Sequence, residues 1–134
     1  MTDDITDEEY AEYELTKTFN DRFRSAPEPS AIVLSRRVSE LPSDVLEELL
    51  HAVRTDNDFT KAKAEGDLAY LKHDMGFVVV RGQEYVWQIE CLTSDGAMCS
   101  DGDSADDIRY LRIGHSLELD LTMIYSIPTP IGRC

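Results

Sequence analysis

The stretch FVVVRGQEYVWQI, residues 77–89, decides the fold of this chain. Its two apolar runs, 77–80 and 85–89, flank a short polar segment that contains Gly82, and this pattern predicts a β-hairpin. Tyr85 and Trp87 are two residues apart, so they share one face of the second strand. We expect core packing on that face, because it explains such aromatic pairs more often than ligand stacking does.

Two further strands are predicted towards the C-terminus. Residues 108–113 form a short strand, and Gly114-His115-Ser116 joins it to residues 117–127. Apolar and polar residues alternate through 117–127, and only Ile124 breaks the period of two. This segment therefore predicts a long strand.

The chain opens with a predicted helix. Thr6 followed by Glu9 is a capping box, and Ile5 with Tyr10 fits a hydrophobic staple, so the helix should begin near Asp7. An apolar stripe for core packing recurs every four residues and consists of Ala11, Leu15, Phe19 and Phe23.

The segment after this helix predicts a strand and a second helix. Pro27 and Pro29 end the first helix, and residues 31–34 predict a short strand. The second helix follows Pro42-Ser43, and its apolar face consists of Val45, Leu46, Leu49, Leu50 and Val53. Residues 55–74 are polar and predict an irregular segment, anchored by Phe59 and by Tyr70-Leu71.

These elements together predict an α+β protein. We expect two N-terminal helices packed on one face of a mainly antiparallel sheet of four to five strands. At 134 residues the chain is long enough for one domain with its own core. Residues 1–14 would form an acidic leader with the start of the first helix, and residues 15–134 a single α+β domain.

Several motifs resemble those of a family of small bacterial proteins recorded as a domain of unknown function. They are Asn20-Asp21-Arg22-Phe23-Arg24, His73-Asp74-Met75-Gly76-Phe77, Val86-Trp87-Gln88-Ile89-Glu90 and Arg109-Tyr110-Leu111-Arg112-Ile113. The resemblance covers about residues 15–115 and departs after Glu90, where Cys91-Leu92-Thr93 replaces an aromatic acidic run. It implies a shared fold and supplies no catalytic residues.

Composition favours a foldable, acidic, cytoplasmic protein. The apolar fraction is 42% and the formal net charge is −14, so the acidity is added to an ordinary globular composition. No segment approaches the roughly 20 apolar residues of a membrane span, and the acidic start is unlike a signal peptide. Cys91, Cys99 and Cys134 are odd in number and include no C-x-x-C pair, so we expect no disulfide framework, and a reducing cytosol fits better.

The acidity is concentrated at the N-terminus. Residues 1–14 carry seven acids and no base, whereas residues 15–94 carry thirteen acids and ten bases. The seven are Asp3, Asp4, Asp7, Glu8, Glu9, Glu12 and Glu14. Three of them, Asp7, Glu8 and Glu9, would also stabilise the positive end of the helix dipole. Such a surface attracts basic proteins and repels nucleic acid and anionic lipid, and plain solubility is the alternative explanation.

A second acidic segment precedes residues 108–113. It begins at Asp95-Gly96 and continues with Asp101, Asp103, Asp106 and Asp107. An EF-hand counted from Asp101 would need an oxygen ligand fifth, glycine sixth and glutamate twelfth, but the chain has Ala105, Asp106 and Arg112 there. We therefore expect a solvated loop that offers a second acidic patch to a partner.

His73, Asp74 and Cys91 suggest a cysteine-nucleophile site. Adjacent His-Asp pairs usually cap turns, however, and a cysteine after an apolar strand usually behaves as a small apolar residue. No glycine motif for an oxyanion hole accompanies them, and His51 and His115 lack a partner at zinc-ligand spacing. The sequence therefore favours a protein without catalytic residues, cofactor or metal.

The predicted function is that of an acidic, non-enzymatic binding protein. It would occupy a cationic, nucleic-acid-binding groove of a partner protein, with no direct contact to nucleic acid or membrane. Its acids could stand in for phosphates, because duplex DNA carries one charge per roughly 1.7 Å of axis. Its physical character is similar to that of anti-CRISPR proteins and other DNA-mimic inhibitors from mobile elements, an analogy without a motif match. Two alternatives stay open: a small cysteine- and histidine-dependent enzyme, and an accessory protein-interaction domain.

Overall fold

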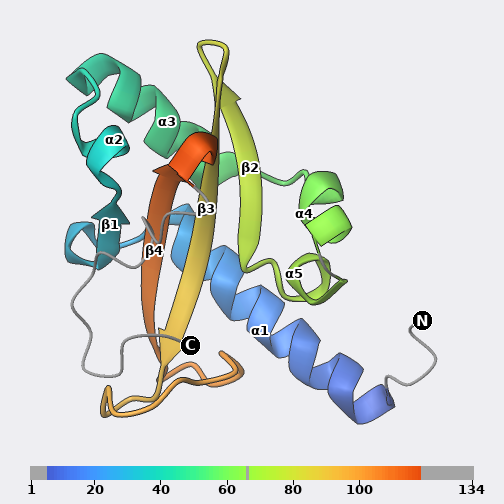
Figure 1. Cartoon of the computed structure of the whole chain (residues 1–134). Helices are drawn as coiled ribbons and strands as arrows, with labels where there is room; N and C mark the ends of the chain where they lie inside the picture. Colours follow the sequence, from blue (N-terminus) through green and yellow to red (C-terminus); the bar gives the residue numbers. More distant parts are fainter. Residues whose placement is uncertain (1–5, 66, 119–134) are drawn as a thin grey trace.

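Helices cover one face of a four-stranded mixed sheet (Figure 1), which confirms the predicted α+β class. The computed structural model describes residues 6–65 and 67–118. In chain order the elements are α1 (Asp7–Ser25), η2 (Pro29–Ala31), β1 (Ile32–Leu34), α2 (Arg36–Ser39), α3 (Ser43–Thr55), α4 (Thr60–Glu65), α5 (Asp67–Lys72), β2 (Met75–Val80), β3 (Gln83–Leu92), β4 (Ile108–His115) and η3 (Ser116–Glu118).

The sheet has the strand order β1-β4-β3-β2. Strand β3 pairs antiparallel with both β2 and β4, and β1 is parallel to β4. The predicted hairpin is confirmed: Arg81 and Gly82 form its turn, with φ of 52° and 79°. Positive φ at both positions defines a type I′ turn, whose twist matches that of the flanking strands.

The core lies between the sheet and the helices. Tyr85, Trp87, Ile89 and Cys91 alternate along β3 and are all buried in one cluster, which confirms the predicted core face. On the helical side the apolar face of α3 is also confirmed, because its Leu49 and Val53 are fully buried in the same cluster.

Gly76 of β2 shows how closely this core is packed. A Cβ built on Gly76 would lie 2.5 Å from the indole of Trp87 and 2.6 Å from Asp56 Oδ2. Any larger residue would therefore displace the indole, whose Nε1 donates a hydrogen bond to Asp56 Oδ2 at 2.9 Å. Glycine is required here because a side chain from the neighbouring strand occupies the space.

Helix α1 begins as predicted. The capping box is present: Glu9 N donates to Thr6 Oγ1 at 3.1 Å, and Thr6 N donates to Glu9 Oε1 at 3.0 Å. The first turns of α1 extend beyond the end of the sheet (Figure 1). Ile5, the other half of the predicted staple, lies outside the described residues.

The predicted apolar stripe of α1 is wrong in its first half. Ala11 is exposed and Leu15 is 49% exposed, because these turns have no core beneath them, whereas Phe19 and Phe23 are half-buried. The buried residues of α1 are polar and also recur every four positions: Thr16, Asn20 and Arg24.

Two further segments differ from the prediction. Residues 55–74 contain α4 and α5, and Phe59 is a buried anchor there, while Tyr70 is 43% exposed and anchors nothing in the core. Ser116–Glu118 is a 3-10 turn instead of the start of a long strand, because Glu118 Oε1 accepts hydrogen bonds from Ser35 Oγ and His115 N. The remainder of the predicted strand at 117–127 lies outside the described residues.

Candidate functional site

The acids of α1 are displayed to solvent. Asp7, Glu8, Glu12 and Glu14 are exposed, and Glu9 is half-buried in the capping box. Glu14 pairs with Lys17 at 3.3 Å, which leaves three of the four exposed acids without an ion pair among the described residues. Asp3 and Asp4 lie outside the described part of the chain.

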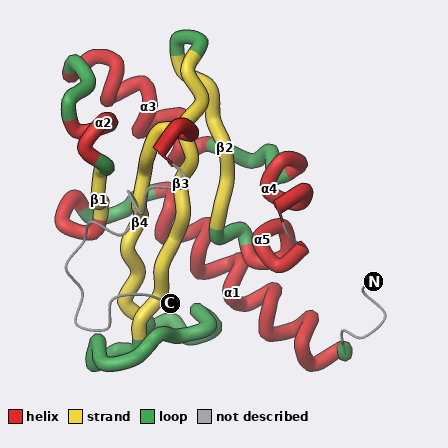
Figure 2. Tube along the Cα trace, in the orientation of Figure 1, coloured by secondary structure: helices red, strands yellow, loops and turns green. Residues whose placement is uncertain are grey.

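The second acidic segment is the long loop that joins β3 to β4 (Figure 2, green). Asp101 and Asp106 are exposed, and Asp103 and Asp107 are half-buried. Asp107 Oδ2 accepts hydrogen bonds from Ser100 Oγ at 2.6 Å and from Ser104 N at 3.3 Å, so this carboxylate also holds the loop in shape. Residues 6–65 and 67–118 contain no group of acidic, histidine and cysteine side chains that could hold a metal ion.

The structure brings the two acidic segments together. Thr16 Oγ1 in the middle of α1 donates a hydrogen bond to the carbonyl of Asp101 at 3.2 Å. Arg109, at the start of β4, donates to the carbonyls of Gly102 and Ser104, which fixes the loop against the same helix. The sequence identified both segments but gave no sign that they adjoin.

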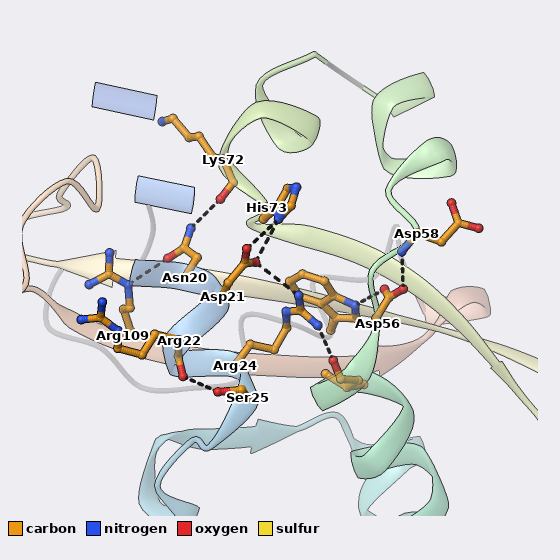
Figure 3. Close-up of polar contacts among 12 residues, drawn as sticks. Asn20, Asp21, Arg22, Arg24, Ser25, Asp56, Asp58, Lys72, His73 and Arg109 are labelled. Carbon is orange, nitrogen blue, oxygen red and sulfur yellow. Dashed lines mark hydrogen bonds and ion pairs between the residues drawn. The ribbon is translucent and has the colours of Figure 1, made fainter. Parts of the chain in front are cut away.

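Asn20 is the centre of a buried polar network (Figure 3). Its Nδ2 donates to the carbonyl of Lys72 at 3.1 Å, and its Oδ1 accepts from Arg109 Nε at 2.8 Å. Helix α5 ends at Lys72, and β4 begins beside Arg109. The Asn20 carboxamide therefore connects α1 to the segment before β2 and to the start of β4, next to the acidic loop.

His73 is part of a second polar cluster. Its Nδ1 lies 2.9 Å from Asp21 Oδ1, and its ring stacks on Phe59 with centroids 3.7 Å apart. Arg24 lies 4.5 Å above the Trp87 ring and donates from Nη1 to the carbonyl of Val53 at 2.6 Å.

The same cluster sets the charge state of Asp21. Partial burial of Asp21 raises the pKa of its carboxyl, but the hydrogen bond and charge of His73, together with the nearby Arg24, lower that pKa below its ordinary value. This cluster packs α1 against the core, and the hydrogen bond with Asp21 occupies the Nδ1 atom of His73.

Cys91 has the environment of a structural thiol. It is buried, its Sγ lies 3.9 Å from Asn20 Oδ1, and burial raises the pKa of the thiol to about 11. The thiol is therefore protonated at neutral pH, which opposes a nucleophilic role. Cys99 is disulfide-bonded.

One cavity of about 330 Å³ opens beside this network. It is lined by residues of α1, of the segment before β2, of all three long strands and of the acidic loop: Thr16, Asn20, Lys72, Asp74, Met75, Gln88, Ile89, Glu90, Cys91, Ser100, Asp101 and Arg112. Asp74 and Cys91, which the sequence placed in one hypothetical active site, both line it. The motifs of the family resemblance include Asn20, Arg109 and Arg112, but sequence reasoning assigned them no role in a site. The repeat of Thr16, Asn20 and Arg24 every four residues was the available signal for the polar face of α1.

The fold and the buried polar network define a small α+β protein with one mixed sheet. Residues 34–116, more than half of the chain, match the model of a family described as Protein of unknown function (DUF3768), and the chain belongs to that family. The match begins at Leu34, so α1 and its motif from Asn20 to Arg24 lie outside it. No curated protein and no solved structure matches the chain. Within the described part of the chain, no helix has the length and apolar character to cross a membrane.

Proposed function

We propose that this chain is a non-enzymatic binding protein whose acidic surface occupies a cationic groove on a partner. The surface consists of the exposed acids of α1 (Asp7, Glu8, Glu12 and Glu14) together with Asp101, Asp103, Asp106 and Asp107 of the adjoining loop. The hydrogen bond from Thr16 to the Asp101 carbonyl supports the proposal most strongly, because it brings the acidic loop against α1 one helical turn from Glu12, although the two segments are distant in sequence.

The partner would be a nucleic-acid-handling protein that this chain inhibits as a DNA mimic, in the manner of anti-CRISPR proteins. Glu8 and Glu12 are both exposed and four residues apart on α1, which corresponds to about 6 Å along the helix axis. Phosphates on one DNA strand repeat about every 3.4 Å along the duplex axis, so the helix reproduces the axial charge density of a phosphate backbone only coarsely. This is enough for a groove that binds DNA mainly through charge.

Direct binding to nucleic acid or to a membrane is not part of the proposal, because a surface of acids repels phosphates and anionic lipids. A cytoplasmic location is part of it, since nucleic-acid-handling partners work there.

The cysteine enzyme is the weaker alternative. Its nucleophile would be a buried thiol with a pKa raised by burial to about 11, and its histidine is hydrogen-bonded to Asp21. A productive nucleophile needs a thiolate and an adjacent base, and this environment disfavours both.

The proposal is tested with a variant that carries D7N, E8Q, E12Q and E14Q. A matched control carries E28Q, E40Q, D44N and E47Q, which removes four exposed charges outside α1 and the loop. Wild type and both variants are used to capture partners from lysate at low and high salt, and the affinity of the captured partner is then measured with and without duplex DNA. If each exposed charge pair is worth about 0.2–1 kcal/mol, the α1 variant should bind about 4-fold to several hundred-fold more weakly.

DNA should displace the partner, and salt should weaken the complex, because exposed charges are screened over about 10 Å at 0.1 M. The free energy of unfolding should change less than the binding energy, because only two of the four replaced acids, Asp7 and Glu8, lie near the positive end of the helix dipole, at about 0.3–1 kcal/mol each. Equal loss in the control variant, or no competition by DNA, would contradict the proposal.

A further inference from the structure

The cavity lies where strand β2 begins. The pairing of β2 with β3 starts at Met75 and Gln88, and the Ile89 N–H donates to the carbonyl of Asp74 at 2.8 Å just before it. Beyond that point, β2 does not cover the edge of β3, and the cavity fills the space between this edge, α1 and the acidic loop. It is therefore located within the proposed acidic surface, beside the contact of Thr16 with Asp101.

Asp74 supplies a half-buried carboxylate to this cavity, and the charges of Lys72 and His73 compensate it only in part. Its carboxyl accepts a hydrogen bond from its own backbone N–H, and no other described residue donates one to it or forms an ion pair with it. The two cations that also line the cavity are engaged elsewhere: Lys72 Nζ lies 5.6 Å from the centre of the Tyr13 ring, and Arg112 forms a buried ion pair with Glu90.

The other walls restrict the chemistry of a ligand. Acidic side chains disfavour an anion, and the described residues offer no set of ligands for a metal ion, which for calcium would need six to eight oxygens. Met75 and Ile89 provide apolar surface, and Gln88 provides an amide beside Asp74. A volume of about 330 Å³ is at the lower end of the range for small-ligand pockets, about 300–1,000 Å³.

We propose that this cavity binds one basic side chain, a lysine or an arginine, of the partner protein, with Asp74 as its counter-ion and with Met75 and Ile89 against its aliphatic stem. This inference rests on the proposed function, because it supplies the anchor point for a cationic partner. A recessed pocket with half-buried walls also adds what a surface of exposed acids lacks, since contacts that exclude water contribute more to affinity than exposed charge pairs do.

The electrostatics of Asp74 agree with this role. Burial raises the pKa of its carboxyl, and the charges of Lys72 and His73 offset this only in part. Removing a carboxylate from water costs free energy when no ion pair replaces its hydration, and this cost lowers the stability of the fold. Charged groups at binding sites often lower the stability of a protein in this way. The other titratable or charged groups around it are Glu90, Cys91, Asp101 and Arg112.

The test uses blocked amino acids in an NMR titration. The probes are Nα-acetyl-lysine-N-methylamide and Nα-acetyl-arginine-N-methylamide, and the uncharged control is Nα-acetyl-norleucine-N-methylamide. The full chain is compared with Asp74→Asn and with the charge-matched Glu28→Gln, whose side chain is exposed and outside the cavity. At least one cationic probe should shift the signals of residues that line the cavity, and the binding should be about tenfold weaker or more in Asp74→Asn only.

Folding of the Asp74→Asn variant is checked by its stability against pH. The folded pKa of Asp74 is raised, so its contribution to stability falls as pH rises from the ordinary value of 3.8 through the folded value. The variant should therefore be as stable as wild type or more stable at pH 7. The inference is overturned if the norleucine probe binds as well as the cations, or if Asp74→Asn binds them as wild type does.

The outcomes separate this inference from the proposed function. If neither cationic probe binds in the cavity while the α1 variant still loses its partner, the proposed function is supported and the inference about the pocket is wrong. If the cationic probes bind through Asp74 while the α1 variant keeps its partner, the inference about the pocket is supported and the proposed DNA mimicry by the α1 acids is wrong.

Discussion

Arg109 Nε donates a hydrogen bond to Asn20 Oδ1 at 2.8 Å, although the two residues are separated by 89 positions in the sequence. Both side chains are buried, and Asn20 uses its other polar atom to donate to the carbonyl of Lys72 at 3.1 Å. This one carboxamide therefore determines how α1 lies against the acidic loop and the Asp74 cavity.

Asn20→Ala should destabilise the fold by about 1–3 kcal/mol, because it leaves a buried guanidinium N–H and a carbonyl without a partner. Thr18→Ala is the matched control, since Thr18 is on the exposed side of α1 and its hydroxyl donates a hydrogen bond to the Glu14 carbonyl. The control should change stability by less than about 0.5 kcal/mol. Urea denaturation followed by circular dichroism measures both, and equal stability of the two variants would contradict the role given to Asn20.

The substitution Asp21→Asn should make the free energy of unfolding depend less on pH in the acidic range. Burial alone would raise the pKa of Asp21, but His73 and Arg24 lower it, so the carboxylate form is favoured in the folded chain. Its contribution is present above the ordinary pKa of 3.8 and is lost as pH falls through the folded value.

The measurement is the melting temperature between pH 2 and 7. Wild type should be the more stable near pH 7, by an amount on the order of 0.2–1 kcal/mol for a partly exposed pair, and the two curves should converge in acid. A gap that stays constant across this range would mean that Asp21 stabilises α1 by some means other than its charge.

Cys91 should react slowly with iodoacetamide in the native protein. A rise of its pKa from 9.0 to about 11 reduces the thiolate fraction roughly a hundredfold at neutral pH, and burial also limits access. Labelling at pH 7 with and without urea, followed by peptide mass spectrometry, should show Cys91 modified mainly in the unfolded chain. Rapid labelling of Cys91 in the native chain would return support to the cysteine-enzyme alternative.

The sequence by itself determined the features whose causes are local. The capping box of Thr6 and Glu9, the turn at Arg81-Gly82 and the period-two burial of Tyr85 and Trp87 each depend on residues a few positions apart. Local backbone geometry and the alternation of a strand are sufficient to predict them, and so the hairpin and the α+β class followed.

Only the tertiary structure decided which face of α1 is buried and what lies beside it. Sequence periodicity detects apolar faces, whereas Thr16, Asn20 and Arg24 are buried because carbonyls of Asp101, Lys72 and Val53 accept their hydrogen bonds. A polar side chain can be buried only where a partner satisfies it, and these partners are 29 to 85 residues away in the sequence. For the same reason, the contact between the two acidic segments and the cavity of Asp74 emerged only once the chain was folded.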